Sequence, residues 1–317
     1  MYMQCTAEGK PQAQRDALCT SHPYKPKRLT QEVRTMKLVK TVAELQAIVK
    51  ETKKSGKTIG LVPTMGALHE GHASLIKAAH AENDFTIVSD FVNPTQFGPT
   101  EDLDAYPRTL EHDCQLAEEM GADVLFAPSP KEMYPSQDMT WVEVTGDITK
   151  VLCGRTRPIH FRGVATVVSK LFNLAQPDKA YFGQKDAQQA QVLKRMVKDL
   201  FFPLEIRVMP IIREADGLAK SSRNVYLNPA ERKAAVILNQ ALKKAKEAFA
   251  AGEKDSKKLV ALTKEMIQSE PMSNIDYVEM YQLPELTAAE DTITVPHLLA
   301  VAVKFGTTRL IDNIILE

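Results

Sequence analysis

Apolar residues in the first two thirds of the chain follow two alternating periods, one typical of buried strands and one typical of helices. Short apolar runs predict extended segments at 58–62, 85–92, 124–126, 139–144, 179–182 and 204–209. Apolar residues spaced three or four apart predict a helix that begins at Thr41 and further helices over 73–81, 109–120, 163–175 and 186–200. Because strands that alternate with helices pair in parallel, we expect a parallel sheet with helices on both faces.

After about residue 212 the order changes, and helices are followed by strands. Asn228, Pro229 and Glu231 predict the start of a long helix that ends at Gly252. A further helix and three strands are then predicted, at 256–269, 275–281, 298–305 and 309–316. This order is typical of an α+β arrangement. We therefore expect a larger α/β domain over 36–211 and a smaller α+β domain over 212–317.

Residues 1–35 form a polar segment that is poor in aliphatic side chains and contains three prolines. The segment has no apolar core of the kind that secretory signals carry, and its acidic residues argue against an organellar transit peptide. We expect a disordered N-terminal extension ahead of the domain that Met36 opens.

The composition excludes several classes of protein. Of the 317 residues, 44% are apolar and 25% are charged, as in an ordinary soluble globular protein. Lysine plus arginine equals aspartate plus glutamate at 40 each, so no overall field attracts nucleic acid or an anionic membrane, and any anion site must be local. Four cysteines without a C-x-x-C spacing indicate reduced thiols, and no apolar run is long enough to span a membrane. We expect a cytoplasmic protein that binds neither nucleic acid nor membranes.

The most informative segment, 61–72, follows a short apolar run that ends at Ile59. His69 and His72 stand three residues apart, with Gly71 between them, where a strand is predicted to give way to a helix. A helix start offers unpaired N–H groups and partial positive charge, and imidazoles add further donors, so this place suits a phosphate chain. Taken alone, such a pair is usually a capped or half-buried surface feature of a helix.

Two further segments carry polar groups at predicted strand ends. Asn93 and Gln96 follow the second long strand and can both donate and accept, which suits a small substrate with hydroxyls and a carboxylate, although an ordinary Asn-Pro turn has the same composition. Arg157, His160 and Arg162 cluster before a predicted helix, where either a bound anion or a solvated charge cluster accounts for them.

Two loops later in the chain also suit a nucleotide. Lys185 can neutralise a phosphate or carboxylate, and Asp186 can accept from ribose hydroxyls. Gln189 lies on the same helix face as Lys185. The loop 216–224, between the two predicted domains, carries Ser221, Ser222 and Arg223 after Asp-Gly. This composition predicts a phosphate clamp that closes over a nucleotide.

Together these segments resemble the pantothenate synthetase (pantoate–β-alanine ligase) family. The similarity runs from residue 36 to 317, and its motifs are PTMGALHEGH (63–72), FVNPTQFG (91–98), EDL and YPRT (101–109), HFRG (160–163), FGQKD with Gln189 (182–189) and DGLAKSSRN (216–224). The family belongs to the nucleotidyl-transfer superfamily that includes class I aminoacyl-tRNA synthetases. This resemblance implies an α/β fold with a Rossmann-like parallel sheet, helices on both faces, and a C-terminal α+β domain that serves as a lid.

The resemblance also implies a reaction and the residues that carry it. Pantoate would attack the α-phosphate of ATP, with Mg2+ on the phosphates, and β-alanine would then displace AMP from pantoyl adenylate. The implied catalytic residues are His69, His72 and Lys185. The implied ATP-binding residues are Met65, His69, His72, Gly183, Lys185, Asp186, Ile212, Ser221, Ser222 and Arg223. The implied pantoate and β-alanine residues are Met65, Asn93, Gln96 and Gln189, with Asp113 on the metal or its water shell.

Homodimerisation is likewise implied by the resemblance alone. This chain departs from the family pattern at Thr95, Ile159, Gln184 and Lys220, of which Lys220 adds a cation beside the clamp. Two other functions stay open: a different adenylyl- or cytidylyltransferase of the same superfamily, and a nucleotide-binding regulator without catalysis. AMP formation that requires both pantoate and β-alanine would separate the three.

Overall fold

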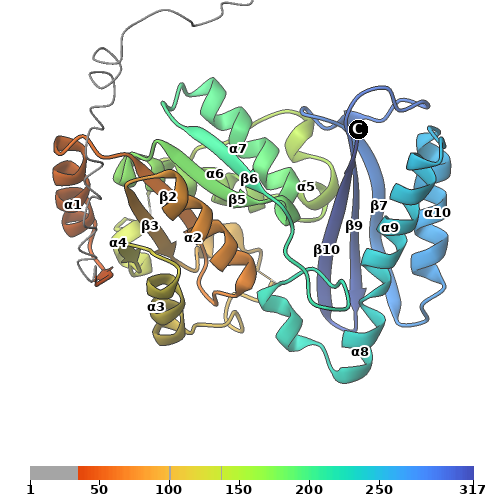
Figure 1. Ribbon diagram of the computed structural model, residues 1–317, viewed down its shortest axis with the longest axis horizontal. Coiled ribbons are helices and arrows are strands. Elements are labelled where there is room, and N and C mark those ends of the chain that lie inside the picture. The colour runs from red at the N-terminus through yellow and green to blue at the C-terminus, as the bar shows by residue number, and fades with distance from the viewer. Residues whose placement is uncertain (1–34, 100, 137) are drawn as a thin grey trace, which may run out of the picture. The chain divides into compact units, whose positions relative to one another are not determined.

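The computed structural model describes residues 35–99, 101–136 and 138–317, and its residues Thr35–Glu317 form one compact unit (Figure 1). The extension predicted over 1–35 lies, apart from Thr35, outside the described residues. No helix in the described part of the chain is long and apolar enough to cross a membrane.

Six parallel strands form the first sheet, as the alternation of strands and helices predicted. The strands are β1 (Lys37–Val39), β2 (Ile59–Thr64), β3 (Phe85–Asp90), β4 (Val124–Phe126), β5 (Lys179–Gly183) and β6 (Glu205–Met209). They lie in the order β1-β4-β3-β2-β5-β6, and every pair is parallel. The chain moves outward from β2 in one direction and from β5 in the other, so the topological switch point lies between β2 and β5. Ligands of such sheets bind beyond the carboxyl ends of the strands at this point.

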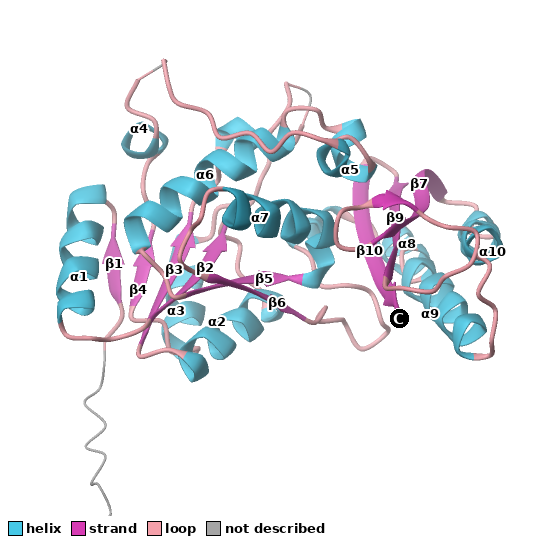
Figure 2. Ribbon diagram, turned by 90° about the horizontal axis from the view of Figure 1, so that it is seen from above, coloured by secondary structure: helices cyan, strands magenta, loops and turns pink. Residues whose placement is uncertain are grey.

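Helices cover both faces of this sheet because its central strands are apolar on both sides. Along β2, Leu61 packs into the core that contains helices α1 (Val42–Lys54), α6 (His160–Ala175) and α7 (Ala187–Asp199), whereas the next residue, Val62, packs into the core with α2 (Glu70–Glu82) and α3 (Leu110–Glu119). Figure 2 shows α6 and α7 on one face and α2 and α3 on the other. A continuous apolar strand is what a doubly covered parallel sheet requires.

The second sheet is antiparallel and is also covered on both faces. Its strands β7 (Ser273–Gln282), β8 (Thr287–Ala288), β9 (His297–Phe305) and β10 (Thr308–Leu316) lie in the order β10-β9-β7-β8. In β9, Leu299 and Val301 pack with helices α9 (Ile237–Ala250) and α10 (Ser256–Gln268), while Leu298 and Ala300 pack with α5 (Leu152–Thr156) and α7. The second of these cores joins the C-terminal sheet to the parallel-sheet part of the chain.

The structure corrects three predicted elements. Residues 139–144 form no strand, because Thr166 of α6 exchanges hydrogen bonds with the backbone of Val142 in place of a strand partner. The long helix predicted from Asn228 is two helices, α8 (Pro229–Ala234) and α9, and a bond from Leu238 N to Ala235 O tightens the turn between them. Helix α6 begins three residues before the predicted start, at His160.

Candidate active site

The two histidines singled out in the sequence lie at the first turn of α2, where each caps the helix. His69 Nδ1 accepts from Gly71 N at 3.0 Å, and His72 Nδ1 accepts from His69 N at 3.3 Å. Their ring centroids are 4.1 Å apart, and both residues line one cavity beside the switch point. Because a neutral imidazole with an accepting Nδ1 carries its proton on Nε2, each ring presents an N–H donor.

Burial keeps both imidazoles neutral at physiological pH. Burial, followed by the positive charge of Lys185, lowers the pKa of His69 from 6.5 to about 4. Burial and the neighbouring His69 hold the pKa of His72 well below its usual value. The pair therefore acts at pH 7 as two oriented N–H dipoles beside a lysine, rather than as two cations.

The loop before His69 is held in an unusual backbone conformation. Gly66 and Ala67 have φ values of 76° and 50°, in the left-handed region that non-glycine residues rarely adopt. Asp113, from the first turn of α3, stabilises this conformation: its carboxylate accepts from Ala67 N at 2.8 Å and from Leu68 N at 2.7 Å. A Cβ on Gly66 would collide with Asp90, which leaves room only for glycine at this position.

This geometry argues against the metal role that the family resemblance suggested for Asp113. The side chain is fully buried, and both oxygens also accept from Thr109 Oγ1, at 3.1 and 3.2 Å. An acid whose lone pairs are taken by amides and a hydroxyl supports a loop and does not face a ligand. Among the described residues there is no group of three or more His, Cys, Asp and Glu side chains that could hold a metal ion.

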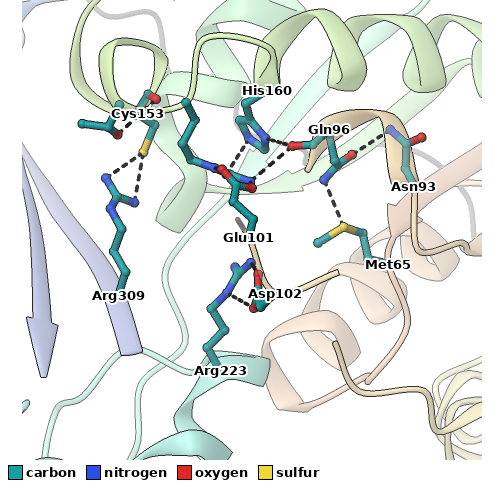
Figure 3. Close-up of polar contacts among 11 residues, drawn as sticks. Met65, Asn93, Gln96, Glu101, Asp102, Cys153, His160, Arg223 and Arg309 are labelled. Carbon is teal, nitrogen blue, oxygen red and sulfur yellow. Dashed lines mark hydrogen bonds and ion pairs between the residues drawn. The ribbon is translucent and has the colours of Figure 1, made fainter. Parts of the chain in front are cut away.

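Asn93 and Gln96 lie together in η2 (Pro94–Gln96) and its cap, beside α6 (Figure 3). Asn93 is 1% exposed, and its amide donates to Gln96 Oε1 at 3.0 Å and to Gly163 O at 3.2 Å, while its oxygen accepts from Tyr134. Gln96 Nε2 has a weaker partner, the sulfur of Met65 at 3.0 Å. The Nε2 group of Gln96 can therefore leave the Met65 sulfur, a poor acceptor, and donate to a ligand. The side chain of Asn93 already has partners, one of which is Gln96.

The basic cluster near α6 divides between the site and the surface. Arg157 and His160 line the cavity, whereas Arg162 lies over the ring of Trp141, 4.5 Å from its centroid. Arg157 donates to His160 Nε2 at 3.2 Å, so the His160 proton is on Nδ1, 3.1 Å from Gln96 O. Burial, followed by the charge of Arg157, lowers the pKa of His160 to about 3.

Lys185 stands on the turn η4 (Gln184–Asp186) that follows β5, as the sequence predicted. Its Nζ lies 3.8 Å from Asp186 Oδ2, and the side chain is 22% exposed. Asn313 of β10 supports this turn, because its amide donates to the carbonyls of Gln184 and Lys185, both at 3.0 Å. The C-terminal sheet thus fixes the backbone that carries the lysine.

The serine-bearing loop packs directly on the histidine loop. Ser222 Oγ donates to Ala67 O at 3.2 Å, and Ser221 caps the short helix η5 (Ser222–Tyr226). Lys220 lies between two acids, 3.1 Å from Glu70 Oε1 and 3.0 Å from Glu214 Oε2, so the cation that departs from the family pattern is neutralised within the chain.

The structure brings the predicted site residues to one place. Apart from Asp113, every residue that the sequence assigned to ATP, pantoate or β-alanine lines the same cavity: Met65, His69, His72, Asn93, Gln96, Gly183, Lys185, Asp186, Gln189, Ile212, Ser221, Ser222 and Arg223. A second cavity adjoins it and extends to the C-terminal sheet, and Lys185, Asp186 and Arg223 line both.

Several residues that complete the site were not predicted from the sequence. Glu101 and Asp102 form ion pairs with Arg157 and Arg223, and Asn313 supports the lysine turn. The two acids stand in the quoted motif EDL (101–103), and that position was a usable signal. Asn313 had none, because its contact depends on how the two sheets pack.

Comparison with known proteins places the chain among described enzymes. The family profile described as Pantoate-beta-alanine ligase matches residues 37–315. A pantothenate synthetase of Acetivibrio thermocellus is 56% identical over 282 residues, which cover 89% of this chain and 100% of that protein. One from Pelotomaculum thermopropionicum is 56% identical over 281 residues, which cover 89% of this chain and 99% of that protein.

Solved structures of pantothenate synthetases resemble this chain over most of its length. The crystal structure of pantothenate synthetase from Thermus thermophilus has a TM-score of 0.83 at 45% identity, and the match covers 88% of this chain and 99% of that one. Pantoate-beta-alanine ligase from Francisella tularensis, solved in complex with Beta-gamma ATP and Beta-alanine, has a TM-score of 0.72 at 34% identity over 88% of this chain and 97% of that one.

Oriented N–H donors and cations around a cavity at the switch point of a parallel sheet define the class, an α/β enzyme built for phosphorylated ligands. The profile and the relatives cover nearly the whole described chain and narrow that class further. The chain belongs to the pantoate–β-alanine ligase family.

Proposed function

We propose that this protein joins pantoate to β-alanine at the expense of ATP, through a pantoyl adenylate, and releases AMP and pyrophosphate. The observation that carries the proposal is the single cavity in which His69, His72 and Lys185 meet Gln96 and Gln189. The first three suit the phosphates, and the two amides suit the hydroxyls and carboxylate of pantoate. The relative from Francisella tularensis, in complex with Beta-gamma ATP and Beta-alanine, supports this choice of ligands.

In the first step a pantoate carboxylate oxygen bonds to the α-phosphorus of ATP, and the bond from that phosphorus to the bridging oxygen of pyrophosphate breaks. No protein nucleophile is needed, so the chain supplies position and charge compensation. The Nε2–H groups of His69 and His72 donate to oxygens that gain charge as pyrophosphate leaves. Lys185 neutralises both phosphate and carboxylate, and Ser221, Ser222 and Arg223 hold the remaining phosphates.

In the second step the amine of β-alanine attacks the acyl carbon of pantoyl adenylate. AMP departs with the former carboxylate oxygen, and the amine nitrogen releases one of its two protons to solvent as the amide forms. Amines of this kind titrate near pH 10, so the neutral amine is the minor form at pH 7. Gln96, Gln189 and Met65 hold the pantoyl group, Asn93 positions Gln96, and Gly183, Asp186 and Ile212 hold the adenosine.

The described residues offer no preformed cage for Mg2+, and Mg2+ commonly binds through substrate phosphates and water. We therefore propose that it comes with ATP, and no step above depends on a protein ligand for it. A homodimer, a cytoplasmic location and a lid role for residues 212–317 belong to the same proposal.

An oxygen-labelling experiment tests the adenylate. The protein is incubated with ATP, Mg2+, β-alanine and pantoate that carries 18O in its carboxylate, and each substrate is omitted in turn. We expect sustained AMP release only when all three substrates are present, with one 18O transferred to AMP. Formation of ADP, or of AMP without label, would contradict an adenylate intermediate.

A further inference from the structure

Arg223, the cation of the serine-bearing loop, already holds an anion in this structure. Its Nε and one terminal nitrogen donate to the two carboxylate oxygens of Asp102, both at 2.9 Å (Figure 3). Neither partner is fully buried: the side chains are 29% and 28% exposed. A guanidinium that faces two carboxylate oxygens in this way has the geometry with which it would grip a phosphate.

The neighbouring acid makes the same kind of contact with the other arginine of the site. Glu101 accepts from Arg157 Nε at 2.8 Å and from a terminal nitrogen at 2.6 Å. Two consecutive carboxylates thus neutralise both guanidinium groups that line the cavity. Only Asp102, however, faces the loop to which we assign the phosphates of ATP.

We propose that Asp102 is a resident counter-ion of Arg223 that competes with the triphosphate, so Arg223 exchanges Asp102 for phosphate oxygens when ATP binds and returns to Asp102 when pyrophosphate leaves. The inference rests on the proposed function, because it requires the phosphates to lie at Arg223. Asp102 then sets an upper limit on how tightly ATP and pyrophosphate bind, and it assists product release.

Contacts other than the Arg223 ion pair also hold the segment that carries Asp102, so the exchange does not require the loop to unfold. Arg108 donates to the carbonyls of Leu103, Asp104 and Tyr106, and Tyr226 OH donates to Ala105 O at 2.9 Å. The competition is between full charges. Burial raises the pKa of Asp102, but hydrogen bonds and charge from Arg223 outweigh it, and the pKa lies below its usual value.

The opposite role for Asp102 is that it orients Arg223 for ATP, and the two roles predict effects of opposite sign. If Asp102 competes, its loss leaves Arg223 without an internal anion and ATP binds more tightly. If Asp102 orients Arg223, its loss weakens binding, because the guanidinium must be ordered at the cost of side-chain entropy. Affinity alone therefore separates a competing acid from a supporting one.

Isothermal titration calorimetry with ATP plus Mg2+, and separately with pyrophosphate plus Mg2+, tests the proposal without pantoate, so no turnover occurs. We expect Asp102→Asn to bind both ligands about three- to fivefold more tightly, the upper range for one partly exposed ion pair. Asp104→Asn removes the same charge from an exposed position of the same loop and should change affinity less than about twofold. In an Arg223→Gln background, Asp102→Asn should have no effect.

Unchanged or weaker binding by Asp102→Asn would overturn the inference, as would equal tightening in the Arg223→Gln background. If Asp102→Asn does not fold, Asp102→Ser removes the same charge with a smaller side chain, and the same outcomes decide. Failure of the unmodified protein to bind ATP would overturn the proposed function as well. Tight ATP binding without an effect at Asp102 would overturn only the counter-ion.

Discussion

The hydrogen bonds of single atoms decide what the paired histidines can do. Because His69 Nδ1 and His72 Nδ1 accept from backbone amides, both rings must donate through Nε2. The pKa of each is lowered mainly by burial, so the donors stay neutral and cost little to desolvate around a highly charged ligand. One feature of the helix cap therefore fixes both the tautomer and the direction of the donors.

Replacing one of these rings should affect the first step of the proposed reaction most. We expect His69→Ala to lower pantoate-dependent exchange of pyrophosphate into ATP at least about a hundredfold, the usual scale for losing one preorganised donor. The control is His80→Ala, which removes an exposed imidazole from the far end of the same helix and should leave the exchange rate unchanged. Equal rates for His69→Ala and the unmodified protein would refute the assignment.

At the scale of elements, the site depends on how closely α6 approaches η2. A Cβ on Gly163 would lie 2.6 Å from the backbone N and Cα of Gln96 and would also collide with Thr95 O. Glycine inside a helix normally costs about 1 kcal/mol relative to alanine. Here its absent side chain lets two elements touch, and that contact places Gln96 beside Met65.

Alanine at this glycine should therefore destabilise the protein despite its better helix propensity. We expect Gly163→Ala to lower the free energy of unfolding by about 1–3 kcal/mol, as overpacked sites do, and to raise the KM for pantoate. Urea denaturation and steady-state kinetics measure the two effects. Gly98→Ala, whose Cβ would find its nearest atom at 3.6 Å, should be nearly neutral in stability. A Gly163→Ala variant with an unchanged free energy of unfolding and an unchanged KM for pantoate would show that α6 can move away from η2 without cost.

At the scale of the whole molecule, buried titratable groups link stability to pH. His160 is 8% exposed, and its pKa falls from 6.5 to about 3 on folding. Below pH 6.5 this histidine therefore binds a proton in the unfolded chain but not in the folded protein. The free energy of unfolding decreases as the pH falls. Asp90 has the opposite effect, because burial and the charge of Asp113 raise its pKa to about 7. The folded protein therefore keeps a proton that the unfolded chain releases, and this contribution to the free energy of unfolding is lost as the pH rises toward 7.

The contribution of His160 can be isolated by comparing two pH values. Between pH 7 and pH 5 this group should cost the protein about 2 kcal/mol of unfolding free energy, from about 1.4 kcal/mol per proton and pH unit. We expect His160→Gln to show a loss smaller by that amount in urea titrations. His80→Gln, at an exposed position, should retain the full loss. Parallel losses in His160→Gln and the unmodified protein would show that His160 binds its proton equally in both states.

Local sequence patterns were enough to predict most elements and the site residues that stand next to strand ends. Each parallel strand delivers its last residues to one edge of the sheet, so His69, Gln96 and Lys185 could be predicted to meet before any packing was known. Capping residues, glycines and apolar periods act within a few positions of the chain, and they marked most helices and strands correctly.

The packing of distant segments determines which polar groups are free for a ligand and which already have partners. Asp113 supports the histidine loop, Asn93 is occupied by Gln96, and Asp102 neutralises Arg223. Asn313 reaches Lys185 from a different sheet. Hydrogen bonds and ion pairs between residues far apart in the chain depend on how whole elements pack, and the local sequence pattern carries no record of that packing.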